Sequence, residues 1–135
     1  MGYDVQQESD GRWRWAVAEM GEHGDRWWLA TGLVSFESKT EAQEDFDLHQ
    51  KAVRNNLNRL VLSKDHVQRL VRALAQTCPS CDNTYFGGVY WHEPDEMGCN
   101  WSVSTMNGPD FQGCFDEIQA GAISLRQAYS IPDEG

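Results

Sequence analysis

The sequence predicts an α+β protein, with a mostly antiparallel sheet of about four or five strands and three helices packed largely on one face. Strand-like alternation and helix-like periodicity occupy separate stretches, in the order ββ-β-α-α-ββ-α, and such segregation favours an antiparallel sheet. The chain has 135 residues, of which 40% are hydrophobic and 11% aromatic. This size and composition suit one domain, residues 1–135, with its own core.

The pattern of apolar and polar side chains in the first 36 residues predicts strands. Residues 3–8 and 13–17 alternate apolar and polar side chains around the turn dipeptide Asp10-Gly11, which is typical of a hairpin. Residues 27–36 are apolar on both sides. That pattern predicts a central strand, with a bulge at Gly32.

Two helices are expected next. Ser38 and Glu41 form a capping box, so the first helix begins at Ser38. Helical spacing carries it to about residue 60 and turns four apolar side chains toward the core: Phe46, Val53, Leu57 and Leu60. Ser63 caps a second helix, which ends near Thr77 and whose buried stripe is Val67, Leu70, Val71 and Leu74.

The last third returns to strands at residues 85–91 and 100–104. A final helix follows over residues 111–129, with six apolar side chains at four-three spacing: Phe111, Phe115, Ile118, Ala122, Leu125 and Tyr129. Residues 13–61 and 85–129 share the order strand, acidic glycine-bearing loop, tryptophan-containing strand and capped helix. The shared order suggests a weak ββα pseudo-repeat.

Six tryptophans distinguish the composition. Each is large enough to anchor a core or an interface, and each needs an acceptor for its indole N–H when buried. We expect core or sheet packing for all of them: Trp13, Trp15, Trp27, Trp28, Trp91 and Trp101.

The charge is strongly and unevenly negative, at −10 overall. Residues 1–50 carry eleven acids and four bases, residues 51–77 one acid and six bases, and residues 78–135 nine acids and one base. An acidic body repels nucleic acid phosphates, so we expect no direct nucleic acid binding. The basic middle is interpreted as a solvated helix face, with phosphate contacts by Arg54, Arg69 and Arg72 as an alternative.

Nothing in the sequence indicates export or a membrane. The N-terminus lacks a basic stretch followed by an apolar stretch, and residue 6, which carries Ser or Thr in a myristoylation motif, is Gln. No apolar run reaches the roughly 18 residues of a membrane helix. We therefore expect a cytoplasmic protein.

Cys78 and Cys81 form the one motif with a specific chemistry. Two cysteines at this spacing can bind zinc or form a redox disulfide. A structural zinc site needs four ligands, which Cys99, Cys114 or His92 would have to complete at irregular spacing. On grounds of compartment we expect reduced cysteines, with zinc and a labile Cys78–Cys81 disulfide as alternatives.

No catalytic residue is predicted. His92 lies in an acidic loop and could act as a base or a ligand, but a solvated loop is the simpler interpretation. Ser102 and Ser104 lack a nucleophile-elbow motif, and Gly87-Gly88 lacks the lysine of a phosphate loop. The sequence therefore favours a protein that is not an enzyme.

The leading hypothesis is a non-catalytic inhibitor or adaptor that docks on a basic surface of a protein partner, as immunity proteins and nucleic-acid-mimicking phage anti-defence proteins do. Complementary charge speeds such encounters, and a few buried aromatics supply most of the affinity. The candidate surface comprises Glu41, Glu44, Asp45, Asp47, Glu93, Asp95 and Glu96. The alternative is a small zinc-binding or redox protein using Cys78 and Cys81.

Overall fold

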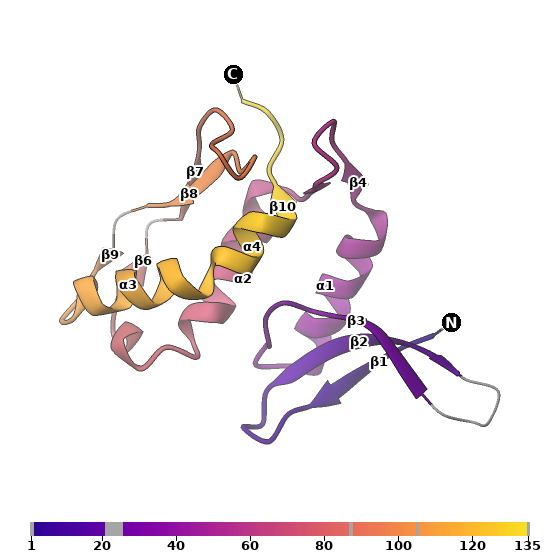
Figure 1. Ribbon diagram of the computed structural model, residues 1–135. Helices are drawn as coiled ribbons and strands as arrows, with labels where there is room; N and C mark the ends of the chain where they lie inside the picture. The colour runs from indigo at the N-terminus through magenta and orange to yellow at the C-terminus, as the bar shows by residue number, and fades with distance from the viewer. Residues whose placement is uncertain (1, 21–25, 87, 105, 135) are drawn as a thin grey trace. The chain divides into compact units, whose positions relative to one another are not determined.

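The computed structural model describes residues 2–20, 26–86, 88–104 and 106–134 (Figure 1). It is α+β, as the sequence predicts. The chain forms two compact units, Met1–Lys51 (unit 1) and Ala52–Gly135 (unit 2).

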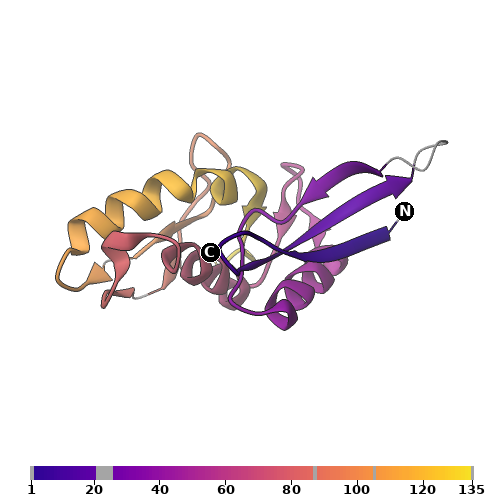
Figure 2. The same ribbon diagram turned by 90° about the horizontal axis from the view of Figure 1, so that it is seen from below.

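Unit 1 is a three-stranded antiparallel sheet with one helix. Strand β2 (Trp13–Met20) lies between β1 (Gly2–Gln7) and β3 (Arg26–Thr31), and α1 (Lys39–Lys51) packs against β1 and β2. Figure 2 shows α1 along one face of this sheet. The predicted hairpin is confirmed, since β1 and β2 pair from Gly2–Ala18 to Gln7–Trp13.

The core of unit 1 is built around Trp15. This side chain is 2% exposed and packs edge-on against the Phe46 ring at 5.2 Å between centroids. The Trp15 Nε1 donates to Asp45 Oδ2 at 2.6 Å, which satisfies the buried indole. Tyr3 stacks on Phe46, with the two ring centroids 3.8 Å apart.

The predicted central strand over residues 27–36 is wrong in two respects. β3 ends at Thr31 and lies at the edge of the sheet. The pairing register shifts where Val17 and Ala18 face Ala30 and Trp28, so the extra residue is Leu29 in β3 rather than Gly32. Gly32 instead approaches the indole so closely that a Cβ there would lie 2.9 Å from Trp15 Nε1, and this contact needs glycine.

Unit 2 contains three helices, a 3₁₀ turn and short strands. The helices are α2 (Lys64–Ala75), α3 (Phe111–Gly121) and α4 (Ile123–Ala128), and η1 (Pro79–Cys81) is the 3₁₀ turn. The strands are β4 (Val53–Arg54), β5 (Leu60–Val61), β6 (Tyr85–Phe86), β7 (Val89–Trp91), β8 (Trp101–Val103), β9 (Met106–Asn107) and β10 (Tyr129–Ser130).

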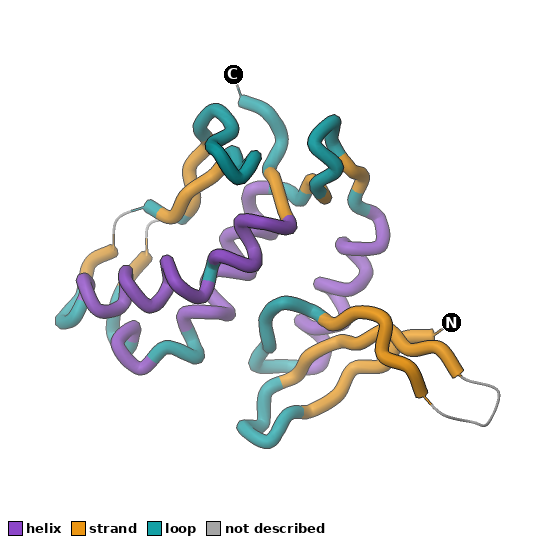
Figure 3. The backbone as a smooth tube through the Cα atoms, viewed as in Figure 1, coloured by secondary structure: helices purple, strands orange, loops and turns teal. Residues whose placement is uncertain are grey.

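In the residues that the structure describes, the strands of unit 2 form small sheets (Figure 3). β4 and β10 flank β5, with β10 parallel to β5, whereas β6–β9 and β7–β8 are antiparallel pairs. The single sheet of four or five strands is therefore a wrong prediction. Short strands bury little by themselves, so α2 and α3, which pack together, provide the main core.

Two helix predictions also need correction. The first helix ends at Lys51, and Val53 and Leu57, expected in the core, are 70% and 51% exposed. The asparagines that follow form a hairpin turn: Asn55 Oδ1 accepts hydrogen bonds from the N–H groups of Leu57 and Arg59, and Asn58 has φ 61°. At the C-terminus, the predicted helix breaks at Ala122 into α3 and α4, and Phe111 is 53% exposed.

Candidate functional site, a pocket beside an acidic turn

The acidic loop between β7 and β8 is a hydrogen-bonded turn centred on Asp95. Its Oδ1 accepts from the N–H groups of Met97 at 2.9 Å and Cys99 at 3.1 Å. The Asp95 N–H donates to the Cys99 carbonyl at 3.0 Å, and Gly98 takes a left-handed φ of 80°. The predicted solvated loop therefore has a defined backbone.

An ion pair joins this turn to the C-terminal helices. Asp95 Oδ2 lies 2.6 Å from Nη2 of Arg126 in α4. Desolvation opposes ionisation of Asp95. The N–H groups of Cys99 and Met97 and the charge of Arg126 outweigh it, and they hold the pKa of the Asp95 carboxyl below its ordinary value.

A buried arginine fixes the same turn from the other side. Arg59, 7% exposed, donates from Nη1 to the carbonyls of Met97 at 3.0 Å and Gln127 at 2.8 Å. Its Nη2 donates to the carbonyls of Arg126 and Tyr129, and its Nε donates to Ser130 Oγ at 2.9 Å. The guanidinium thus satisfies carbonyls at the end of α4, where the helix dipole favours a positive charge.

A pocket of about 190 Å³ lies beside the turn. Its walls come from the asparagine turn, the β7–β8 loop and the chain after β10. They are mainly apolar or amide-bearing: Asn55, Asn56, Leu57, Val61, Trp91, Pro94, Gly98, Asn100, Ser130, Ile131, Pro132 and Asp133. Leu57 is the most exposed large apolar side chain among them, at 51%.

The Asn100 side chain, which lines the pocket, bonds to the backbone of Ile131 as a neighbouring strand would. The Asn100 amide donates to the Ile131 carbonyl at 2.7 Å and accepts from the Ile131 N–H at 2.9 Å. Trp101 Nε1 donates to the Tyr129 carbonyl at 3.0 Å. These bonds fix the positions of Asn100 and Ile131, two of the residues that line the pocket.

Two exposed carboxylates belong to the turn whose Pro94 and Gly98 line the pocket. Glu93 and Glu96 flank Pro94 and Asp95 and are exposed. Neither forms an ion pair within the described part of the chain. Asp95 itself is engaged internally, so it shapes the turn rather than offering its charge.

The other predicted acids belong to α1 in unit 1. Glu44 and Asp47 are exposed, and Glu41 is exposed with its Oε1 accepting from Ser38 Oγ at 3.2 Å in the predicted capping box. Asp45 is 4% exposed and bonded to Trp15. An exposed docking role for Asp45 is therefore excluded, because its carboxylate satisfies a buried indole.

A second hollow of about 350 Å³ lies on the sheet of unit 1 and is lined by residues that include Gln6, Glu8, Arg14 and Thr31. Arg14 lies 3.4 Å from the Glu8 carboxylate and donates to the Gly32 carbonyl at 2.9 Å. The charges of Glu8 and Arg14 thus neutralise each other, which makes this hollow a weaker candidate for a binding site.

The cysteines differ from the expectation. Cys81 and Cys114 form a disulfide between η1 and α3, with their Cα atoms 4.6 Å apart, while Cys78 and Cys99 are free. The expectation of reduced cysteines is thus wrong for Cys81 and Cys114, because the fold brings the two within bridging distance. In this state Cys81 has no thiolate for zinc.

His92, directly after β7, contacts Ser102 of β8, a pairing that the sequence does not predict. His92 Nε2 lies 2.8 Å from Ser102 Oγ, and Nδ1 lies 2.6 Å from the Glu93 carbonyl. No group of three or more His, Cys, Asp or Glu side chains within the described ranges is arranged to hold a metal ion. The pair is a cross-strand contact that orders the start of the acidic turn.

The basic segment is divided among several elements. Arg54 on β4 donates to the Asn58 carbonyl at 3.0 Å, Arg59 is buried, and Arg69 and Arg72 are exposed on α2.

In the described part of the chain, no helix is long and apolar enough to cross a bilayer.

Sequence reasoning missed the pocket. Helical spacing places Leu57 in a core, and strand-like patterns include Trp91 and Asn100. The available signal was the run Asn55-Asn56-Leu57-Asn58, since asparagines favour turns and tolerate the left-handed conformation.

No protein-family model matches the chain, and neither the curated proteins nor the solved structures contain a significant match. The chemistry of the site therefore rests on the residues themselves.

Proposed function

We propose that the chain is a non-catalytic protein-binding module, an inhibitor or adaptor that docks on a basic segment of a protein partner. The supporting observation is a partly apolar pocket in unit 2 that is lined by Pro94, in the turn that carries Glu93 and Glu96. These two exposed carboxylates form no ion pair with the described residues. Apolar anchor sites next to open charges are the usual elements of such recognition.

The pocket walls favour an extended partner segment with an apolar anchor. Leu57, Trp91 and Pro94 offer apolar surface, while the Asn55 and Asn56 amides can bond to a peptide backbone. The pocket is small, so one side chain rather than a cofactor-sized ligand fits it. A Lys or Arg next to that anchor would meet Glu93 or Glu96.

Preorganisation is the second support. Hydrogen bonds within the chain already position the residues around the pocket, and they are made by Asp95, Arg59 and Asn100. A partner therefore meets a shaped surface and does not have to order it, which lowers the entropic cost of binding. Unit 2 carries ten acids and six bases, so its net charge of −4 also attracts a basic segment.

The test is a selection of random peptides displayed against the immobilised full chain. We expect enriched peptides to carry Lys or Arg beside an apolar residue. Their affinity should fall as ionic strength rises from about 0.01 M to about 0.15 M, because the Debye length shortens.

Matched variants locate the site. The double variant Glu93→Gln, Glu96→Gln should weaken the selected peptides about tenfold or more, since two complementary charges are lost. The control, Glu44→Gln with Asp47→Asn on α1, should leave affinity unchanged. Equal loss in the control would assign the binding to α1, and peptides without basic residues would contradict the proposal.

A further inference from the structure

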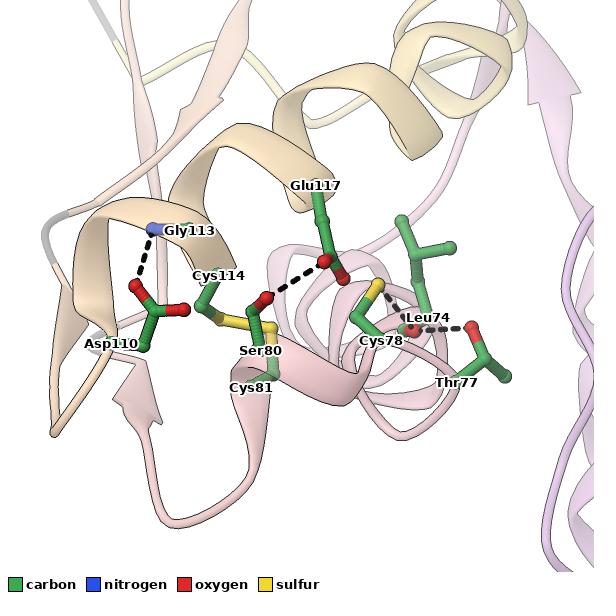
Figure 4. The surroundings of a disulfide bond; sticks show 9 residues. All are labelled: Leu74, Thr77, Cys78, Ser80, Cys81, Asp110, Gly113, Cys114 and Glu117. Carbon is green, nitrogen blue, oxygen red and sulfur yellow. Dashed lines mark hydrogen bonds between the residues drawn. A yellow bond between two sulfur atoms is a disulfide. The ribbon is translucent and has the colours of Figure 1, made fainter.

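Three of the four cysteines gather where η1 meets α3 (Figure 4). The Cys81–Cys114 disulfide links the two elements across 33 residues of sequence. Cys78 keeps a free, half-buried thiol in the same turn as Cys81, whose N–H donates to the Cys78 carbonyl at 3.0 Å. The free thiol of Cys78 and the disulfide-bonded sulfur of Cys81 thus belong to one Cys-x-x-Cys motif.

We propose that Cys78, Cys81 and Cys114 form a thiol–disulfide exchange centre in which the disulfide moves from Cys81–Cys114 to Cys78–Cys81. This inference is independent of the docking pocket. The Cys78 thiolate attacks Cys81 Sγ, the Cys78–Cys81 bond forms, and the Cys81–Cys114 bond breaks. The electron pair leaves on the Cys114 sulfur, which takes up the proton that Cys78 released, so no external oxidant or reductant is consumed.

The turn geometry permits the product. The hydrogen bond from the Cys81 N–H to the Cys78 carbonyl closes a four-residue turn. The first and last Cα atoms of such a turn lie within about 7 Å of each other. Disulfides span Cα distances of up to about that value. The Cα atoms of Cys78 and Cys81 therefore lie within the range that a disulfide spans. The Cys78 thiol donates to the Leu74 carbonyl at 3.5 Å and must leave that acceptor to attack Cys81 Sγ.

Glu117 controls the attacking thiol. It lies three residues after Cys114 on α3, and its Oε1 accepts a hydrogen bond from Ser80 Oγ at 2.8 Å. Figure 4 shows its carboxylate beside the Cys78 sulfur. Burial and the negative charge of Glu117 raise the pKa of the Cys78 thiol, which keeps it protonated near neutral pH and slows the exchange.

The exchange would alter the tertiary links of unit 2. The Cys81–Cys114 bond ties η1 to α3, whereas a Cys78–Cys81 bond closes only a local turn. Cys114, 1% exposed, would become a buried free thiol. The exchange would therefore remove the covalent link between η1 and α3 without any net oxidation or reduction.

Peptide mapping of the full chain distinguishes the two forms. Residues 73–125 contain no Lys or Arg, so trypsin combined with a protease that cuts before Asp yields residues 73–81 and 110–115 as separate peptides. The first form gives these two peptides linked, with Cys78 alkylated. The second gives residues 73–81 with an internal disulfide and Cys114 alkylated.

The chain is incubated without added thiol at about pH 7 and about pH 9, trapped with acid and alkylated. We expect the second form to appear faster at the higher pH. Glu117→Gln, which keeps an acceptor for Ser80, should raise the rate about threefold for each unit that the pKa of Cys78 falls, because more thiolate outweighs its lower nucleophilicity.

Two variants serve as controls. Asp116→Asn, an exposed acid on the same helix, should keep the wild-type rate, and Cys78→Ser should show only the Cys81–Cys114 form. The proposal is overturned if Cys114 is never alkylated in wild type or Glu117→Gln at the higher pH. It is equally overturned if the purified chain contains four free thiols.

Discussion

The indole Nε1 of Trp15 donates a hydrogen bond of 2.6 Å to Oδ2 of Asp45, and both side chains are buried in unit 1. The bond joins the middle strand of the sheet to α1. A buried carboxylate is costly without such partners. Asp45 is therefore a structural residue in a helix whose other acids face solvent.

Replacing Asp45 tests this role. Asp45→Ala leaves a buried indole N–H without its acceptor, and we expect a loss of about 2–3 kcal/mol in unit 1. Asp45→Asn keeps an acceptor and should cost less. Asp47→Ala, at an exposed position, should stay within about 0.5 kcal/mol of wild type. Hydrogen exchange of the amides in β2 and α1 gives the opening free energies, and equal values for the Asp45 and Asp47 variants would contradict the assignment.

Arg59 is expected to dominate the stability of unit 2. Arg59→Lys keeps the charge, but one ammonium cannot reach the carbonyls of Met97, Arg126, Gln127 and Tyr129 together. We expect a loss of roughly 3 kcal/mol, measured by thermal denaturation and by exchange of amides 123–131. Arg54→Lys, which loses one exposed bond to the Asn58 carbonyl, is the matched control. If the two variants are equally stable, the buried network contributes little.

Helix starts were the part of the fold most accessible from sequence. Ser38 and Ser63 each cap a helix as expected, with their hydroxyls accepting from the N–H groups of Glu41 and His66. A cap depends on residues within one turn, so local sequence suffices to predict it. Of the stripe predicted for α2, Val67, Leu70 and Val71 are buried and Leu74 is half-buried, because helical periodicity is also a local pattern.

Arg59 shows why the rest could not be predicted. The sequence pattern places it on a solvated basic face, yet the partners of its guanidinium lie 38 to 71 residues further along the chain. Only the tertiary fold brings those carbonyls together. The Cys81–Cys114 pairing has the same origin, since the connectivity of cysteines cannot be deduced from their spacing.

Asp95 predicts a pH dependence. Its folded pKa lies below its ordinary value of 3.8, so its contribution to stability is present above that value and is lost as the pH falls through the lower folded value. Asp95→Asn should therefore show a flatter loss of stability below about pH 4 than wild type. Glu96→Gln, exposed in the same turn, should follow the wild-type curve. Chemical denaturation at a series of acidic pH values makes the comparison, and parallel curves for wild type and Asp95→Asn would refute the prediction.

Reduction should affect the two units unequally. The Cys81–Cys114 bond closes a loop with a sequence separation of 33, and removing it should cost unit 2 about 3–4 kcal/mol through the entropy of the unfolded chain. Unit 1 contains no cysteine and serves as an internal control. Hydrogen exchange with and without dithiothreitol reports both units in one experiment. Unchanged protection in α3 and η1 after complete reduction would argue against a stabilising bond.

Leu57 provides a test of the pocket by itself. Leu57→Ala removes exposed apolar surface and should leave stability nearly unchanged. Its effect on the display-selected peptides should be a loss of about tenfold or more, as for an anchor residue. Val53→Ala, at another exposed apolar position, is the control. Titration of both variants with one labelled peptide decides between an anchor and an incidental surface leucine.

Hydrogen exchange of the full chain with and without a saturating selected peptide maps the contact directly. The account predicts slower exchange at residues 55–61 and 93–100, the two segments that border the pocket, and little change across residues 39–51. Protection confined to α1 or to the sheet of unit 1 would contradict it.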